Sequence, residues 1–181
     1  MTKKFFLLIS MIIFLAACNV NTVETEKIKM YNGRDLTIGV IGSAPDIKEK
    51  NIVFEKIDFN DLKNDVEKLS NNLDAIIIMK ESLTEADDDR YVAAYHTLTI
   101  PTFFMQSTKL HVPFTNEGID YDKFPDVDSS NYATGFLSVK TDEGYNEQTW
   151  RYQLGSNKGS KQDIQTVYTR IFNTIESVNS K

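Results

Sequence analysis

The sequence predicts a three-layer α/β domain built on a mostly parallel sheet, and three observations carry this prediction. Short apolar runs bounded by turn residues alternate with stretches whose apolar residues recur at helical spacing. One run, DAIIIMK (74–80), is apolar for four consecutive residues after its alanine, which is typical of a strand covered on both faces. A long amphipathic stripe begins at about Ser160. Helices on both faces of a mostly parallel sheet satisfy all three patterns.

The first part of the chain is expected to hold four strands, with helices after the second and third. The strands are LTIGVI (36–41), IVFEKI (52–57), DAIIIMK (74–80) and IPTFFMQS (100–107). The helices are 58–72, with Asp58 as its N-cap, and 83–98, with Thr84 and Asp87 in a capping pattern. Only about nine residues join the first two strands, whereas a parallel crossover usually needs a dozen or more. The connection is therefore either a single helical turn around APDIKEK, or the two strands pair antiparallel.

The second part of the chain changes character after residue 108. Residues 109–131 form a long irregular connection of the kind that often carries function. YATGFLSVK and QTWRYQL flank TDEGYNE and predict a hairpin. The final helix has the apolar stripe Ile164, Val167, Tyr168, Ile171, Phe172, Ile175 and Val178. The predicted fold is Rossmann-like or flavodoxin-like, with an antiparallel hairpin at one edge of the sheet and a terminal amphipathic helix.

The first eighteen residues predict a targeting segment. Lys3 and Lys4 precede an apolar or small-residue run, Phe5 to Ala17, which is too short to span a membrane and has the length of a signal-peptide core. The run ends in Leu-Ala-Ala-Cys, which resembles the lipobox of bacterial lipoproteins. That resemblance implies that the sulfur of Cys18 receives a diacylglyceryl group and that cleavage leaves Cys18 as the new N-terminus. Two acyl chains would give stable membrane attachment without a transmembrane helix.

This reading divides the chain into residues 1–17 as signal peptide, 18–32 as lipidated cysteine and tether, and 33–181 as a single α/β domain. Removal of residues 1–17 leaves 18 basic against 26 acidic residues, a net charge of −8. A negative body argues against a nucleic-acid partner. The expected location is the extracytoplasmic face of a cell membrane, and the composition favours a Gram-positive source. The expected partners are the membrane, through the anchor, and an envelope protein.

One candidate small-ligand site lies at the carboxyl edge of the predicted sheet, where open α/β sheets bind ligands. Its residues lie at or just after the carboxyl ends of predicted strands: Gly42, Ser43, Asp46, Lys80, Glu81 and Gln106. The glycines of IGVIGSAPD do not form a dinucleotide fingerprint or a P-loop. The alternative interpretation is a plain turn that ends the first strand.

A candidate partner-binding surface lies on the hairpin and consists of Tyr145, Trp150, Arg151 and Tyr152. Tryptophan, tyrosine and arginine dominate the energetics of protein interfaces. Alternation would place Trp150 and Tyr152 on one face of the strand and Arg151 on the other. The alternative interpretation is that the aromatic face covers the core.

Other patterns carry weaker indications. The acids of DYDKFPDVD (120–128) predict a solvated loop, with a weak calcium site as the alternative, because phenylalanine and proline occupy positions that an EF-hand needs for a ligand and for glycine. His96 and His111 are the only histidines and do not form a zinc pattern. We expect no metal and no cofactor. Catalysis is left open with a lean against it, because no serine lies in a G-x-S-x-G motif.

The body is similar to uncharacterised lipoproteins of Bacillus-like bacteria through LTIGVIGSAPDIKE, LDAIIIMKESLTEA and NYATGF. That resemblance implies no activity. IGVIG followed by DAIII also resembles one lobe of a solute-binding protein, although such proteins close two lobes on a ligand and this chain has the length of one. The sequence therefore predicts a membrane-anchored lipoprotein with a non-catalytic binding or accessory domain. The alternatives are a small-ligand receptor and, less favoured, an envelope hydrolase.

Overall fold

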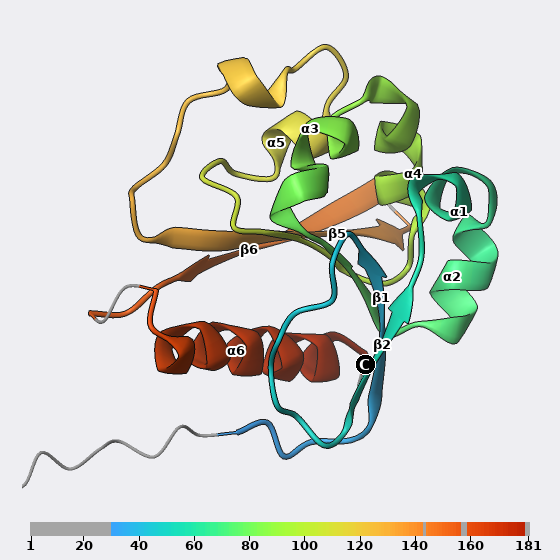
Figure 1. The fold of residues 1–181 in the computed structure, drawn as a ribbon. Helices are drawn as coiled ribbons and strands as arrows, with labels where there is room; N and C mark the ends of the chain where they lie inside the picture. The colour runs from blue at the N-terminus through green and yellow to red at the C-terminus, as the bar shows by residue number, and fades with distance from the viewer. Residues whose placement is uncertain (1–29, 143, 157–158, 180–181) are drawn as a thin grey trace, which may run out of the picture.

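The structure is a computed structural model that describes residues 30–142, 144–156 and 159–179. Cys18, the signal peptide and the tether up to residue 29 lie outside the described residues. The described chain forms one six-stranded sheet in the order β2-β1-β3-β4-β5-β6 (Figure 1). The strands are β1 (Leu36–Ile41), β2 (Ile52–Lys56), β3 (Ala75–Ile78), β4 (Thr102–Met105), β5 (Asn131–Thr141) and β6 (Gly144–Gln153).

The first four strands are parallel and the last two are antiparallel. β1 pairs parallel with both β2 and β3, and β3 pairs parallel with β4. β5 then runs antiparallel to β4 and forms a hairpin with β6. The predicted mostly parallel sheet with an antiparallel hairpin at one edge is confirmed at this level. The hairpin turn is tighter than expected, because β5 runs to Thr141 and β6 already begins at Gly144.

The antiparallel alternative for the first two strands is wrong, and so is the helical turn. Residues 42–51 form an irregular crossover with only turns and bends. Within residues 42–51 no helix forms, and hydrogen bonds to the terminal helix hold this crossover segment in place. The Glu49 carboxylate accepts from the Gln165 side chain at 2.7 Å and from the Thr169 hydroxyl at 3.3 Å, both in the terminal helix. The short connection can therefore cross the face of the sheet without regular structure.

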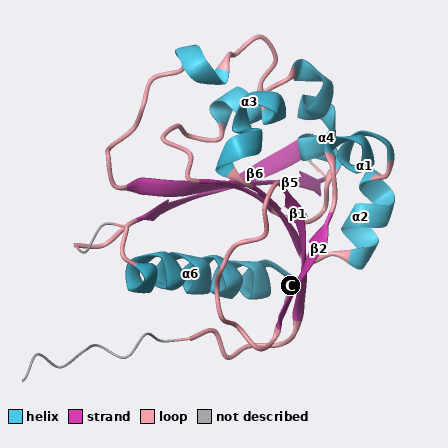
Figure 2. Cartoon of the chain, viewed as in Figure 1, coloured by secondary structure: helices cyan, strands magenta, loops and turns pink. Residues whose placement is uncertain are grey.

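The described residues form six α-helices, which are distributed over the two faces of the sheet (Figures 1 and 2). They are α1 (Phe59–Asn64), α2 (Val66–Asn72), α3 (Leu83–Ala86), α4 (Val92–Thr97), α5 (Val112–Thr115) and α6 (Lys161–Asn179), with 3-10 turns at Lys80–Ser82, Asp89–Tyr91 and Tyr121–Lys123. The helix α6 alone covers one face, and α1 to α5 lie on the other. The three-layer prediction is thereby confirmed.

Both predicted helices of the first half are broken by aspartates. Asp65 leaves helical geometry (φ −123°, ψ 30°) and separates α1 from α2. Asp88 is extended, and its side chain accepts from the backbone N–H of Arg90, which ends the helical path within 83–98. Aspartate side chains compete in this way with the helical hydrogen-bond ladder. The capping pattern at Thr84 was wrong, because α3 has Ser82 as its N-cap and no side-chain cap bond.

Two apolar clusters hold the layers together. One joins α6 to the sheet through residues that include Ile38, Ile77, Phe103, Ile171 and Phe172. The other joins α1 to α5 to the opposite face. Consecutive residues of β3 contribute to opposite clusters, so that all four are fully buried, as the unbroken apolar run predicted.

Candidate functional site

At the carboxyl ends of the parallel strands, backbone N–H groups that could bind a ligand already donate hydrogen bonds to a side chain of the protein itself. Gly42 ends β1 with φ +107°, a conformation that favours glycine. The next residue, Ser43, donates its N–H to the Glu81 carboxylate at 2.7 Å. The N–H groups of Glu81 itself and of Ser43 lower the pKa of this carboxyl. A carboxylate thus takes the position where a ligand anion would meet the loop after β1.

The remaining members of that predicted set have other partners. Gln106 adopts φ 54° directly after β4, and its side-chain amide lies 3.4 Å from the Tyr132 hydroxyl. Asp46 lies 3.8 Å from Lys161, and both side chains are almost fully exposed. Lys80 is exposed at the start of a 3-10 turn. The structure therefore brings Ser43 and Glu81 together and gives Asp46 and Gln106 different partners.

The hairpin residues divide between core and surface. Tyr152 is buried on the α6 side and its hydroxyl donates to Thr174 Oγ1 at 2.7 Å. Trp150 is half-buried on that same side, with its ring 6.0 Å from that of Phe103. Tyr145 is 67% exposed, and Arg151 contacts Asp128. The two aromatic residues on one face cover the core, whereas Tyr145 and Arg151 remain at the surface.

The acids of residues 120–128 do not converge on one point. Each of three carboxylates pairs with a different cation: Asp120 with Lys123 at 2.7 Å, Asp126 with Lys109 at 2.8 Å, and Asp128 with Arg151 at 3.0 Å. Within the described part of the chain, no group of three or more histidine, cysteine or acidic side chains is placed to hold a metal ion.

The two histidines pack on one phenylalanine rather than on each other. The His111 ring stacks on Phe136 at 5.6 Å, and the His96 ring meets the same ring edge-on at 5.1 Å. Burial lowers the pKa of His111. His96 Nε2 lies 2.9 Å from the carbonyl oxygen of Thr115. These contacts explain both histidines as residues that pack against the sheet.

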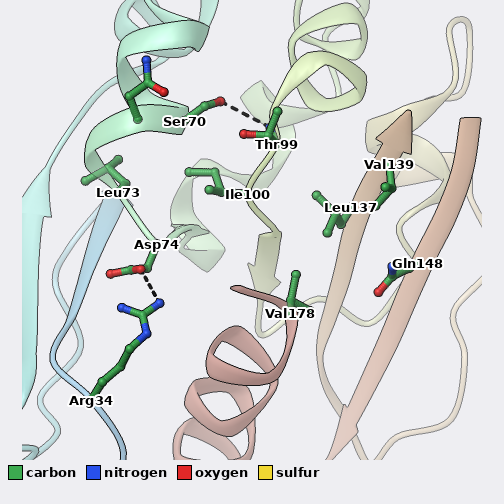
Figure 3. Close-up of a pocket in the computed structure, with 11 residues that line it drawn as sticks. Arg34, Ser70, Leu73, Asp74, Thr99, Ile100, Leu137, Val139, Gln148 and Val178 are labelled. Carbon is green, nitrogen blue, oxygen red and sulfur yellow. Dashed lines mark hydrogen bonds and ion pairs between the residues drawn. The ribbon is translucent and has the colours of Figure 1, made fainter. Parts of the chain in front are cut away.

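A groove of about 570 Å³ lies at the opposite edge, where the parallel strands begin (Figure 3). The residues that line it come from α2 and the segment after it, from the starts of β3 and β4, from the hairpin, and from the end of α6. They are Arg34, Ser70, Asn71, Leu73, Asp74, Thr99, Ile100, Leu137, Val139, Gln148 and Val178. This size lies within the range of small-ligand and side-chain pockets.

Internal bonds fix the polar rim of the groove. Asp74 accepts from the Thr37 backbone N–H at 2.8 Å and from Arg34 Nη2 at 2.6 Å, and this pairing raises the pKa of Arg34. Ser70 Oγ accepts from the Thr99 backbone N–H at 3.3 Å, as the dashed line in Figure 3 marks. The rim is therefore held by the domain itself and is preorganised before anything binds.

The groove presents both polar and aliphatic groups, and the polar groups make up more of its exposed lining. Five of its lining side chains are aliphatic: Leu73, Ile100, Leu137, Val139 and Val178. The titratable groups among the lining residues are Arg34 and Asp74, and they form an ion pair with each other. A fixed pair of this kind differs from the separated acid and base that general acid–base catalysis uses.

Sequence reasoning missed this groove because its residues lie in separate segments, each of which reads locally as a strand or a helix end. Only Asp74 gave a local indication of a site, because it is a charged residue that directly precedes the most buried strand.

No protein-family model, curated protein or solved structure matches this chain. Among the helices of the described residues, none combines the length and apolar character that a membrane crossing requires.

Proposed function

We propose that this chain is a bacterial lipoprotein, anchored through Cys18 on the extracytoplasmic face of the membrane, whose folded body is a non-catalytic binding domain. The N-terminal charge, the short apolar run and the Leu-Ala-Ala-Cys sequence support the anchor. Because Tyr31 is buried in the α6 core cluster, the tether before it, residues 19–30, would span at most about 43 Å if fully extended. The body would thus work close to the membrane, where envelope proteins are its natural partners.

The groove at the amino edge of the strands is the observation that carries the binding role. It combines aliphatic walls with a rim whose charges and backbone donors are already satisfied. A charged small molecule would find no unpaired opposite charge among Arg34 and Asp74. A segment of a partner protein would match both kinds of lining, because its polar groups can meet the polar part of the groove while an apolar side chain contacts the aliphatic part. We infer that a protein segment is the guest.

The second candidate is a small-ligand receptor at the carboxyl edge. The order 2-1-3-4 of the parallel strands is consistent with the predicted flavodoxin-like fold, in which the topological switch point would lie between β1 and β3, beside Gly42, Ser43 and Glu81. Because the Glu81 carboxylate occupies the loop donors, such a ligand would be neutral or cationic there. An envelope hydrolase is the least favoured alternative.

Two matched valines test the groove. Val178 lines the groove at the end of α6. Val53 is 56% exposed on β2, the edge strand on the other side of the sheet from the hairpin. The protein would be crosslinked in its native membrane as wild type, Val178→Arg and Val53→Arg. We expect a defined partner with wild type and Val53→Arg, and its loss with Val178→Arg. Equal recovery from all three would exclude the groove as the contact.

The anchor is tested separately with Cys18→Ala. Mass spectrometry of the wild-type N-terminal peptide should show a chain that begins at a diacylglyceryl-modified Cys18. The variant should leave the membrane fraction and keep its signal sequence. A wild-type chain that begins elsewhere, or that carries no lipid, would contradict the lipoprotein assignment without bearing on the groove.

A further inference from the structure

The strand β6 forms a long open edge of the sheet. It contains ten residues and pairs, among the described residues, with β5 alone. Its residues are mostly exposed over that length. The other edge strand, β2, has five residues and ends in Glu55 and Lys56. An open edge presents unpaired N–H and C=O groups to any extended chain that can align with it.

β6 has few of the features with which proteins usually block such an edge. Lysine, proline, an inward charge or a bulge in the edge strand are the common devices. The segment Gly144–Gln153 contains neither lysine nor proline. The one register shift of the hairpin lies between Asn131 and Ala133 at the start of β5, opposite the last two residues of β6. The open edge is therefore free of lysine, proline and bulges and is available to pair along most of its length.

The charges of β6 are arranged symmetrically about one residue. Glu147 and Arg151 are its only charged residues, and they lie two positions before and two positions after Thr149. All three share one face of the strand, because side chains alternate along it. If a second copy pairs antiparallel with Thr149 on the two-fold axis, each Glu147 lies directly opposite an Arg151. A shift of one residue in either direction removes both opposite-charge pairs.

Both charged side chains remain accessible for such a contact. The side chain of Glu147 is 50% exposed, with its carboxylate 3.9 Å from His96 Nδ1. The side chain of Arg151 is 43% exposed and bonds Asp128 at 3.0 Å and Asn131 at 3.5 Å. Because a guanidinium carries five donor hydrogens, Arg151 can keep these partners and still meet a second carboxylate.

We propose that two copies of this chain associate through β6, antiparallel and centred on Thr149, so that their sheets join into one. The contact is isologous and closes after two copies, since the same strand serves on both sides. It also brings Trp150 of one copy opposite Gln148 of the other, next to the rim of the groove. The association rests on the strand edge and not on the anchor or on a groove ligand.

A single cysteine on the two-fold axis tests the register. Directly opposed residues of antiparallel strands have Cβ atoms about 4.5–5.5 Å apart, which is close enough for a disulfide with a small adjustment. Full-length Thr149→Cys, extracted from membranes in mild detergent and mildly oxidised, should give a covalent dimer on a non-reducing gel. Val53→Cys, on the other edge, is the matched control, and the parent with Cys18 alone sets the background. Equal dimer from both variants, no dimer above background, or a Thr149→Cys adduct with another protein would each overturn the proposal.

A charge exchange tests the pairing itself. Glu147→Arg and Arg151→Glu each replace two attractive pairs per dimer by repulsive ones and should weaken the dimer about tenfold in sedimentation velocity. The double variant E147R/R151E restores opposite charges and should restore the dimer. Thermal unfolding of the diluted monomers separates the loss of the Arg151–Asp128 ion pair in Arg151→Glu from the loss of the dimer, and a cooperative transition would show that the fold is intact. A double variant as weak as the single ones would refute the register.

Discussion

Asp58 illustrates how one side chain can start a helix in this chain. Its carboxylate accepts from the backbone N–H of Asn60 at 2.8 Å and of Asp61 at 3.0 Å, and Asp61 returns a bond to the Asp58 N–H. Asp65 occupies the same position before α2 but makes no such bond. We expect Asp58→Ala to lower the free energy of unfolding by about 1 kcal/mol in urea titrations, and Asp65→Ala to change it much less. Equal losses would mean that the cap bonds do not stabilise α1.

Single residues were predictable where the bonding is local. The Asp58 cap was readable because its partners lie two and three residues away. Ser160 was predictable in the same way, and its hydroxyl accepts from the Asp163 N–H at 3.1 Å. The bond between Ser43 and Glu81 joins residues 38 positions apart, so that local patterns gave no sign of it. Ser43 and Glu81 were each candidates for binding a ligand, and the hydrogen bond between them could be seen only in the folded structure.

At the scale of elements, Asp128 joins the end of the 109–131 connection to the hairpin. Its carboxylate bonds the hydroxyl and the backbone N–H of Ser130, the Gln153 amide at 2.7 Å and Arg151, and these bonds lower its pKa to about 2. A lowered pKa means that the ionised form stabilises the folded state fully above the ordinary value near 3.8. The contribution is then lost as the pH falls through about 2.

Asp128→Asn removes this titration but keeps the shape of the side chain. In urea titrations at low salt between pH 5 and pH 2, its stability should fall less steeply than that of wild type. Ser130→Ala, which removes the first of the bonds, should give an intermediate slope. The difference should shrink in high salt, because the carboxylate is exposed and screened by solvent. Identical slopes for all three proteins would show that Asp128 does not link the connection to β6.

Elements were predictable where hydrophobic periodicity decides them, and their continuity was not. The stripe of α6 and the unbroken apolar run of β3 emerged as expected. The breaks at Asp65 and Asp88 did not, because the apolar spacing of 58–72 and 83–98 continues across them. The parallel β1–β2 pair was also hard to predict, since its crossover depends on Glu49 reaching Gln165 in α6.

For the molecule as a whole, the layers were predictable and the groove was not. Strands that are apolar on both sides require cover on both faces, and the amphipathic stripes supply it. A groove forms where the ends of several layers fail to meet. Leu73 after α2, Ile100 before β4 and Val178 near the end of α6 lie at three such ends, and nothing local in the sequence marks them as lining a groove.

Among the described helices, α6 alone covers one face of the sheet, so the stability of the whole domain should depend on it. Phe172 is fully buried in α6, with its ring 5.8 Å from that of Tyr31. Phe172→Ala should cost about 3–5 kcal/mol, a large share of the roughly 5–15 kcal/mol that holds a typical domain together. The neighbouring Asn173 is exposed, and Asn173→Ala should change the free energy of unfolding by no more than about 0.5 kcal/mol.

The same titration shows whether the two faces unfold together. Trp150 is the only tryptophan and lies against the α6 face, so its fluorescence reports on that layer, whereas far-ultraviolet circular dichroism reports on all helices. Because both clusters share the fully buried strand β3, we expect the two signals to change at one urea concentration in wild type and in Phe172→Ala. A fluorescence change that precedes the loss of helix signal would mean that α6 leaves the sheet first and that the domain is two cooperative units rather than one.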